Sequence, residues 1–310
     1  MKKRKLERVV FTSFVVFISL VSLVFFVSCS KEDNNKIKPI NEDVPEEGFP
    51  ILKEVPYVSM PVPDELQKLV YNKDNSDVSL SKIKDTVVVY VGGGPIHIVD
   101  HEDYDLLGKV EDGLKAEGFL NHSVLGMRQA HDINSTVFAS GMLFTEANAQ
   151  EVNDKTVNII EKVITWLKSN HKIVYLHGHS YGGFVSQHYM SANKIHPDGY
   201  VFSGTRMKSV QVFFDNLPKN NHVAFKDGIV PIIEKLKSYE IPYFNVVSKL
   251  KLNEMKNYTV LLDGNPMLAK TLYSLGGKDE AVGKIEKDEK DFLVKNKVAL
   301  LYLMKEIMEM

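Results

Sequence analysis

The sequence predicts a fold of the α/β class, with a mostly parallel sheet and helices on both of its faces. Short, continuous apolar runs recur along the chain, and such runs are typical of strands buried on both sides of a parallel sheet. These runs alternate with amphipathic helical patterns, which implies right-handed βαβ units. The apolar share of the chain, 44%, is ordinary for a globular protein and leaves ample material for a core.

The first predicted strand covers residues 86–91, Thr-Val-Val-Val-Tyr-Val, and ends in the loop Gly92-Gly93-Gly94-Pro95. A helix follows, because Leu107, Val110 and Leu114 recur at steps of three and four residues. Gly118 is a fitting end for this helix, since glycine readily adopts the left-handed conformation found just past a helix terminus.

The later elements repeat this alternation. The spacing of Val157, Ile160, Ile164 and Leu167 predicts a second amphipathic helix, and a third is expected over 181–193. Further strands are predicted over residues 123–127, 172–176, 200–203, 271–275 and 298–303.

The N-terminus resembles a targeting segment. A cationic start is followed by the uncharged apolar stretch from Val9 to Ser28, which suits either a cleaved signal or an uncleaved membrane anchor. Cys29, the single cysteine of the chain, comes directly after this stretch and resembles the lipidated cysteine of a bacterial lipobox. Phe26 stands where that pattern usually has Leu. We therefore expect a lipoprotein with its lipid on Cys29, held in the cell envelope of a bacterium, at the outer membrane.

Composition divides the remaining chain. Six of the twelve prolines fall between residues 39 and 63, which predicts an extended tether and argues against a core there. Part of this extension, Tyr57 to Val70, is expected to pack onto the domain. The segment 205–270 breaks the strand–helix rhythm and is interpreted as an insertion that forms a lid. The predicted organisation is a signal peptide (1–28), a lipidated tether and extension (29–81), a core (82–204 and 271–310) and the insertion (205–270).

The motif that carries chemistry is Gly178-His179-Ser180-Tyr181-Gly182, placed between a predicted strand and a predicted helix. This is the nucleophile-elbow pattern, in which a sharp, strained turn exposes the serine hydroxyl at the edge of the sheet. The flanking glycines are needed because side chains there would collide with the neighbouring strand and helix. A glycine-rich turn with a helix-capping serine is the plain alternative.

The loop at 92–95 can supply hydrogen-bond donors. Backbone N–H groups of Gly93 and Gly94, together with that of Tyr181, are candidates for an oxyanion hole. A phosphate-binding loop is a poor alternative, because no Gly-Lys-Ser/Thr follows and no Gly-x-Gly-x-x-Gly opens a helix. A simple tight turn is the other alternative.

From residue 82 onward, the order of strand, glycine loop, elbow, insertion and late strand resembles the α/β-hydrolase fold family. In that family an acid follows the seventh strand, and Asp279 in Gly276-Gly277-Lys278-Asp279 occupies this position. The resemblance implies that Asp279 orients a histidine and stabilises its imidazolium form. Asp263 is a second candidate for the acid.

The sequence departs from this family at the histidine, which the resemblance expects after the last strand. No histidine follows His222 in the sequence. Either the segment after the last strand is altered or shortened, or another residue serves as the base; His97 and His131 are candidates by position, and His222 lies in the insertion. Side chains beside an elbow serine point away from the base position, so His177 and His179 are expected to fill packing space instead.

The expected function is a serine hydrolase that cleaves an ester, thioester or amide through an acyl-enzyme on Ser180, impaired if no histidine serves as base. The alternative is a non-catalytic lipoprotein of this fold that binds a ligand. The partners expected are a small-molecule or acyl substrate and a membrane, reached through the lipid on Cys29. Metal and cofactor motifs are absent, and a net charge of −2 without a basic stripe gives no reason to expect nucleic acid.

Overall fold

The structure is a computed structural model that describes residues 54–303, except residues 75, 77, 96–98, 100 and 277. The predicted signal peptide, Cys29 and the tether up to residue 53 lie outside the described residues. So do His97 and Gly277.

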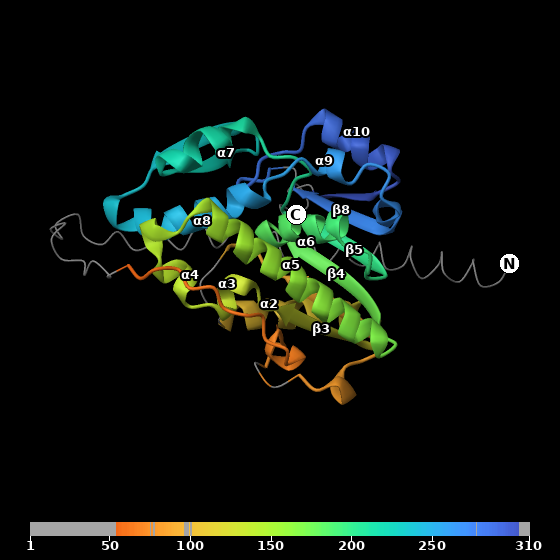
Figure 1. Cartoon of the computed structure of the whole chain (residues 1–310). Coiled ribbons are helices and arrows are strands. Elements are labelled where there is room, and N and C mark those ends of the chain that lie inside the picture. Colours follow the sequence, from red (N-terminus) through yellow and green to blue (C-terminus); the bar gives the residue numbers. More distant parts are fainter. Residues whose placement is uncertain are drawn as a thin grey trace.

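A seven-stranded sheet forms the centre of the molecule, in the order β1-β3-β2-β4-β5-β8-β9 (Figure 1). All neighbouring strands run parallel except β1, which pairs antiparallel with β3. This confirms the predicted parallel sheet. The strands are β1 (Val70–Tyr71), β2 (Thr86–Val91), β3 (His122–Met127), β4 (Ile173–His179), β5 (Gly199–Ser203), β8 (Thr271–Gly276) and β9 (Ala299–Leu303).

Helices cover both faces of the sheet, as expected. The apolar stripe of α2 packs against Val88 and Tyr90 on one face, while α5 and α6 pack on the other. The helices are α2 (His101–Ala116), α3 (Ala130–Ile133), α4 (Thr136–Ala139), α5 (Glu146–Ser169), α6 (Tyr181–Ala192), α7 (Gln211–Asn216), α8 (Ile241–Glu254), α9 (Tyr258–Leu261) and α10 (Lys287–Lys295). None of the helices in the described residues is long and apolar enough to cross a bilayer.

The segment 205–270 is more regular than its composition suggests, and we call it the cap. It contains α7, α8 and α9 together with a separate two-stranded hairpin of β6 (Asn221–Lys226) and β7 (Val230–Lys235). Two backbone hydrogen bonds fix the hairpin to the loop after β8. The amide of Phe225 donates to the carbonyl of Glu280 at 2.8 Å, and the amide of Lys284 donates to the carbonyl of Gly228 at 2.6 Å.

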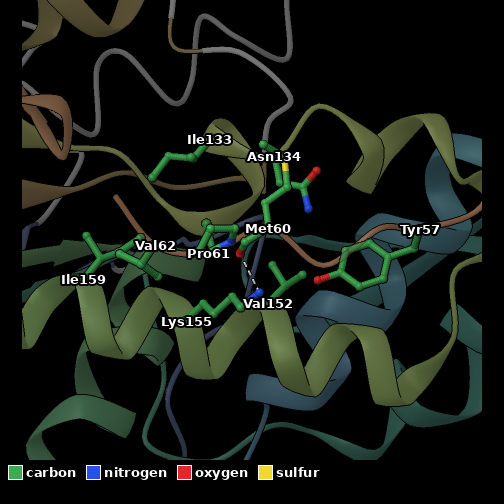
Figure 2. A pocket seen from close by; sticks show the side chains of 10 residues that line it. Tyr57, Met60, Pro61, Val62, Ile133, Asn134, Val152, Lys155 and Ile159 are labelled. Carbon is green, nitrogen blue, oxygen red and sulfur yellow. Dashed lines mark hydrogen bonds between the residues drawn. The ribbon is translucent and has the colours of Figure 1, made fainter. Parts of the chain in front are cut away.

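Residues 54–64 form a strap over α3, α4 and α5 (Figure 2). The amide of Val55 donates to the carbonyl of Ala139 at 3.0 Å, and Lys162 forms an ion pair with Asp64 at 3.0 Å. The cavity between the strap and α5 has a volume of about 10 Å³, room for about one water molecule. It is therefore too small for an acyl substrate.

Just after the strap, Leu69, Val70 and Tyr71 are buried and extend the sheet as β1. The sequence analysis did not predict this strand. Only two residues pair with β3, and such a short strand leaves no alternating pattern to detect.

Candidate active site

Ser180 lies in the strand–turn–helix arrangement that the elbow motif requires. Strand β4 ends at His179, and α6 begins at Tyr181. Between them the backbone of Ser180 has φ 51° and ψ −120°, a conformation that residues other than glycine rarely adopt. Such strain persists only where the surrounding structure enforces it, and it gathers at functional sites.

The two glycines of the motif are required by close backbone contacts. A Cβ atom on Gly178 would lie 2.7 Å from the carbonyl oxygen of Gly182, and one on Gly182 would lie 2.3 Å from the carbonyl oxygen of Val91. Neither neighbour can move without shifting a strand or a helix. The predicted collisions with strand and helix are thus confirmed.

The glycine loop after β2 lies against the elbow. A Cβ atom on Gly93 would lie 3.1 Å from Cβ of Ser180, and the side chain of Gln129 donates to the carbonyl of Gly92 at 3.2 Å. Tyr181 is the first residue of α6, so its N–H has no acceptor within the helix. Tyr181 is thus next to Ser180 in the chain and Gly93 is next to it in space, while Gly94 follows Gly93. The role of all three as oxyanion donors stays a prediction.

The sheet order places this pair of loops at a switch point. Strand β3 lies on one side of β2, and β4 lies on the other, so the connections after β2 and β4 leave in opposite directions. In open α/β sheets, ligands bind outside the carboxyl ends of the strands at such a point. Ser180 and the glycine loop are both located there.

The histidines on either side of the elbow face Ser203 of β5. Nε2 of His177 lies 2.9 Å from Oγ of Ser203, and Nδ1 of His179 lies 3.0 Å from the same atom. Burial lowers the pKa of His177 to about 3 and that of His179 to about 4. Both rings are therefore neutral at pH 7, and they pack inside the fold as expected.

His131 of α3 is also buried and neutral, because burial lowers its pKa to about 3. Its ring centroid lies 6.0 Å from that of Tyr181 and 5.8 Å from that of Phe138. Neither ring nitrogen forms a hydrogen bond, but Nε2 lies 3.5 Å from Oδ1 of Asp132, whose side chain is buried as well. His222 is exposed on the hairpin, 6.5 Å from the ring of Phe244. Among the described residues, no histidine side chain is hydrogen-bonded to Oγ of Ser180.

Asp279 follows β8, as the resemblance requires, but its carboxylate is hydrogen-bonded to backbone amides of its own loop. Oδ1 accepts hydrogen bonds from the amides of Ala281 at 3.0 Å and Val282 at 2.9 Å. Burial raises the pKa of Asp279, and these amides and Arg206 oppose that rise. The second candidate, Asp263, is exposed and forms an ion pair with Lys295 at 3.2 Å.

A buried ion pair beside this loop was missed by the sequence analysis. Nη2 of Arg206 lies 2.6 Å from Oε2 of Glu289, and both side chains are almost wholly buried. Glu289 also accepts the amide of Met207 at 3.0 Å. The pair joins α10 to the loop after β5, and nothing in the spacing of the two residues signals it.

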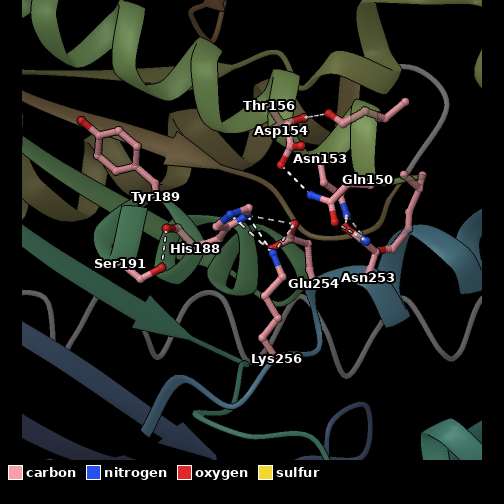
Figure 3. Close-up of polar contacts among 12 residues, drawn as sticks. Gln150, Asn153, Asp154, Thr156, His188, Tyr189, Ser191, Asn253, Glu254 and Lys256 are labelled. Carbon is pink, nitrogen blue, oxygen red and sulfur yellow. Dashed lines mark hydrogen bonds and ion pairs between the residues drawn. The ribbon is translucent and has the colours of Figure 1, made fainter. Parts of the chain in front are cut away.

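A second polar network joins the elbow to the cap. The hydroxyl of Tyr181 donates to Oδ1 of Asn153 in α5, and Nδ2 of Asn153 donates to the carbonyl of Leu250 at 3.1 Å. Figure 3 shows Asn153 beside Asn253 of α8, with Glu254 and its partner His188 nearby. Asn153 is a polar residue among the buried apolar residues of α5, and this was the signal in the sequence that could have predicted the network.

No protein-family model and no curated protein matches this chain. Among solved structures, an alpha/beta hydrolase enzyme from a Medee basin deep-sea metagenome library is 12% identical, with 73% of this chain and 83% of that chain covered and a TM-score of 0.46. A soluble variant of monoglyceride lipase from Saccharomyces cerevisiae is 12% identical (82% and 87% covered, TM-score 0.42). A carboxyl esterase from Bacillus coagulans is 12% identical (76% and 83% covered, TM-score 0.43).

These likenesses are distant, so the fold is assigned from the molecule itself. The parallel sheet is covered by helices on both faces, and the strained turn at Ser180 joins a central strand to a helix at the carboxyl edge of that sheet. The chain has the α/β-hydrolase fold.

Proposed function

We propose that the protein is a serine hydrolase in which Ser180 attacks the carbonyl carbon of an ester, thioester or amide. The strained backbone of Ser180 carries this proposal, because a plain helix cap does not need φ 51° on a serine. The N-terminus of α6 would favour the developing negative charge, and the amides of Tyr181 and of Gly93 or Gly94 would donate to the oxyanion.

The attack also needs a base to take the hydroxyl proton, since serine is a weak nucleophile alone. Among the described residues, His131, His177 and His179 are buried and neutral, and none is hydrogen-bonded to the hydroxyl of Ser180. This observation supports a second candidate, a ligand-binding protein that keeps the fold but turns over no substrate.

A fluorophosphonate probe separates the two candidates, because it labels only an activated serine. We expect the chain to be labelled, and we expect Ser180→Ala to abolish the label. Ser191→Ala, on the same helix, serves as the control and should label like the parent chain. Absence of label on the folded parent chain, or a label that survives in Ser180→Ala, would refute the hydrolase proposal.

The predicted N-terminal signal adds a location to this proposal. Lipid on Cys29 would hold the domain at a membrane of the bacterial cell envelope, and residues 30–53 would separate the two. The substrate would then be a small molecule or an acyl compound met at that membrane.

A further inference from the structure

The cap exposes apolar side chains along β7, where every residue is exposed. Ile229 at the turn is 64% exposed, Val230 57%, Ile232 40% and Ile233 49%. Single exposed apolar residues are normal on a protein surface, whereas contiguous ones mark an interaction site. This strand therefore needs a partner that covers aliphatic side chains.

The exposed surface continues beyond the hairpin. Tyr239 and Tyr243 follow β7 in the chain and are exposed, and the ring of Tyr243 stacks on Phe138 of α4 at 5.2 Å. Met142 and Leu143 come just after α4 and are half exposed. We call seven of these residues the cap face: Met142, Leu143, Ile229, Val230, Ile232, Tyr239 and Tyr243. Ile233 is left out because it is opposite the buried Val223 in the hairpin, so its side chain lies on the other side of the two strands.

Pairing of β7 with a strand of a second copy is disfavoured by Pro231. Phe225 and Pro231 are opposite each other in the hairpin, and the amide of Phe225 points away from β7, toward Glu280. Phe225 and Pro231 are therefore a non-hydrogen-bonded pair, in which the N–H and C=O positions of both residues point away from the partner strand. The N–H that Pro231 lacks is therefore one that the open edge of β7 would have offered, and proline at an edge prevents strand addition.

The chemistry of the cap face fits a lipid surface instead. Aliphatic side chains lie at the hairpin tip and along β7, while Tyr239 and Tyr243 combine an apolar ring with a polar hydroxyl, as side chains at membrane–water interfaces do. The segment 221–240 carries three lysines, Lys226, Lys235 and Lys237, and three acidic residues, Asp227, Glu234 and Glu240. The ammonium of Lys237 lies 5.9 Å above the ring of Tyr239. Lysines in such places can reach lipid phosphates while their stems stay on apolar surface.

The start of the described chain lies at the same face. The side chain of Glu54 accepts the amide of Met142 at 2.9 Å, and Figure 1 shows the beginning of the strap, α4 and the start of α8 toward one end of the molecule. The hairpin extends from there to the loop after β8, where Gly228 at its tip accepts the amide of Lys284. The chain that leads back to the predicted lipid site at Cys29 therefore departs next to the cap face. We propose that the cap face docks on the surface of a lipid bilayer.

This proposal does not depend on the chemistry of Ser180 and is tested by fluorescence quenching. The full chain is reconstituted in vesicles of phosphatidylcholine and phosphatidylglycerol with brominated acyl chains. The sequence holds one tryptophan, Trp166 in α5, so every variant shares the same background. Ile232→Trp reports from the cap face, and Leu120→Trp reports from the connection between α2 and β3, where the side chain is 75% exposed.

We expect brominated lipid to lower the added fluorescence of Ile232→Trp by about twofold or more and to leave that of Leu120→Trp unchanged. Equal quenching of the two would overturn the proposal. So would a signal from Ile232→Trp that changes with the protein-to-lipid ratio, because the occupant would then be a second copy. Circular dichroism of both variants verifies that the fold is kept.

Discussion

At the scale of single residues, Ser180 has the backbone features that a catalytic nucleophile in this fold requires. Its backbone is strained, the neighbouring glycines leave no room for a side chain, and a Cβ atom on Gly93 would lie 3.1 Å from the Cβ of Ser180. The motif was readable from the sequence because its spacing between strand and helix is local. No histidine among the described residues is hydrogen-bonded to the hydroxyl, and a base contributed by a distant part of the chain leaves no local pattern in the sequence.

Burial of neutral histidines predicts sensitivity to acid. The pKa values of His131 and His177 are lowered to about 3, whereas unfolded histidine binds a proton near pH 6.5. Below that pH the unfolded chain binds more protons than the native chain, so stability falls as the pH falls, by up to about 1.4 kcal/mol per pH unit for each such residue. The loss continues until the native pKa is reached.

His131→Leu tests this directly. Between pH 6.5 and 5.0, urea unfolding should show that the variant loses about 2 kcal/mol less stability than the parent chain. His101→Gln, at an exposed position, should lose as much as the parent. Equal losses for the parent and His131→Leu would show that the ring of His131 is already protonated or solvated in the native state.

At the scale of elements, the main strands and helices were predicted correctly and the cap was not. Parallel strands buried on both faces, such as β2, carry continuous apolar runs, and α5 repeats its buried residues at helical spacing. In the cap, β7 is exposed along its whole length, so no burial pattern marks it. Its partner β6 was likewise hidden among Asn, Lys and Pro residues.

The Arg206–Glu289 pair gives a prediction for α10. Glu289→Gln removes the close, buried counterion of Arg206 and leaves the guanidinium only the half-exposed carboxylate of Glu286, 4.0 Å away. We expect this variant to lose about 3–5 kcal/mol of unfolding free energy in urea denaturation. The double variant Arg206→Met, Glu289→Leu should recover much of that loss, because neither charge then remains buried. A single variant as stable as the parent would show that the pair contributes little.

At the scale of the whole molecule, the strap joins the described domain to the predicted tether. Packing of Tyr57 to Val70 onto the domain was expected, but its partners on α4 and α5 were not, because they are residues far away in the sequence, such as Lys162 with Asp64. They fix where the chain enters the domain. The predicted lipid on Cys29 would therefore place this end of the domain nearest the membrane.

Lipidation of Cys29 can be tested on the intact chain. Cells that express it are fed an alkyne fatty acid, and we expect the label to appear on the protein and to disappear in Cys29→Ser. Ser28→Ala keeps the cysteine and serves as the control. Absence of label on the parent chain would indicate that the N-terminus acts as an uncleaved anchor, and label retained in Cys29→Ser would indicate that another site is modified.

The two backbone hydrogen bonds between the hairpin and the loop after β8 have a consequence for local motion. The amides of Phe225 and Lys284 are held across the same contact, one donated from each side. Neither segment can separate without breaking both bonds, so they form one cooperative unit of local opening, as amide hydrogen exchange would detect. Asp279 lies inside that unit. The frequency with which the loop around Asp279 opens is therefore set by its hydrogen bonds to the surface hairpin, and not by the stability of the sheet alone.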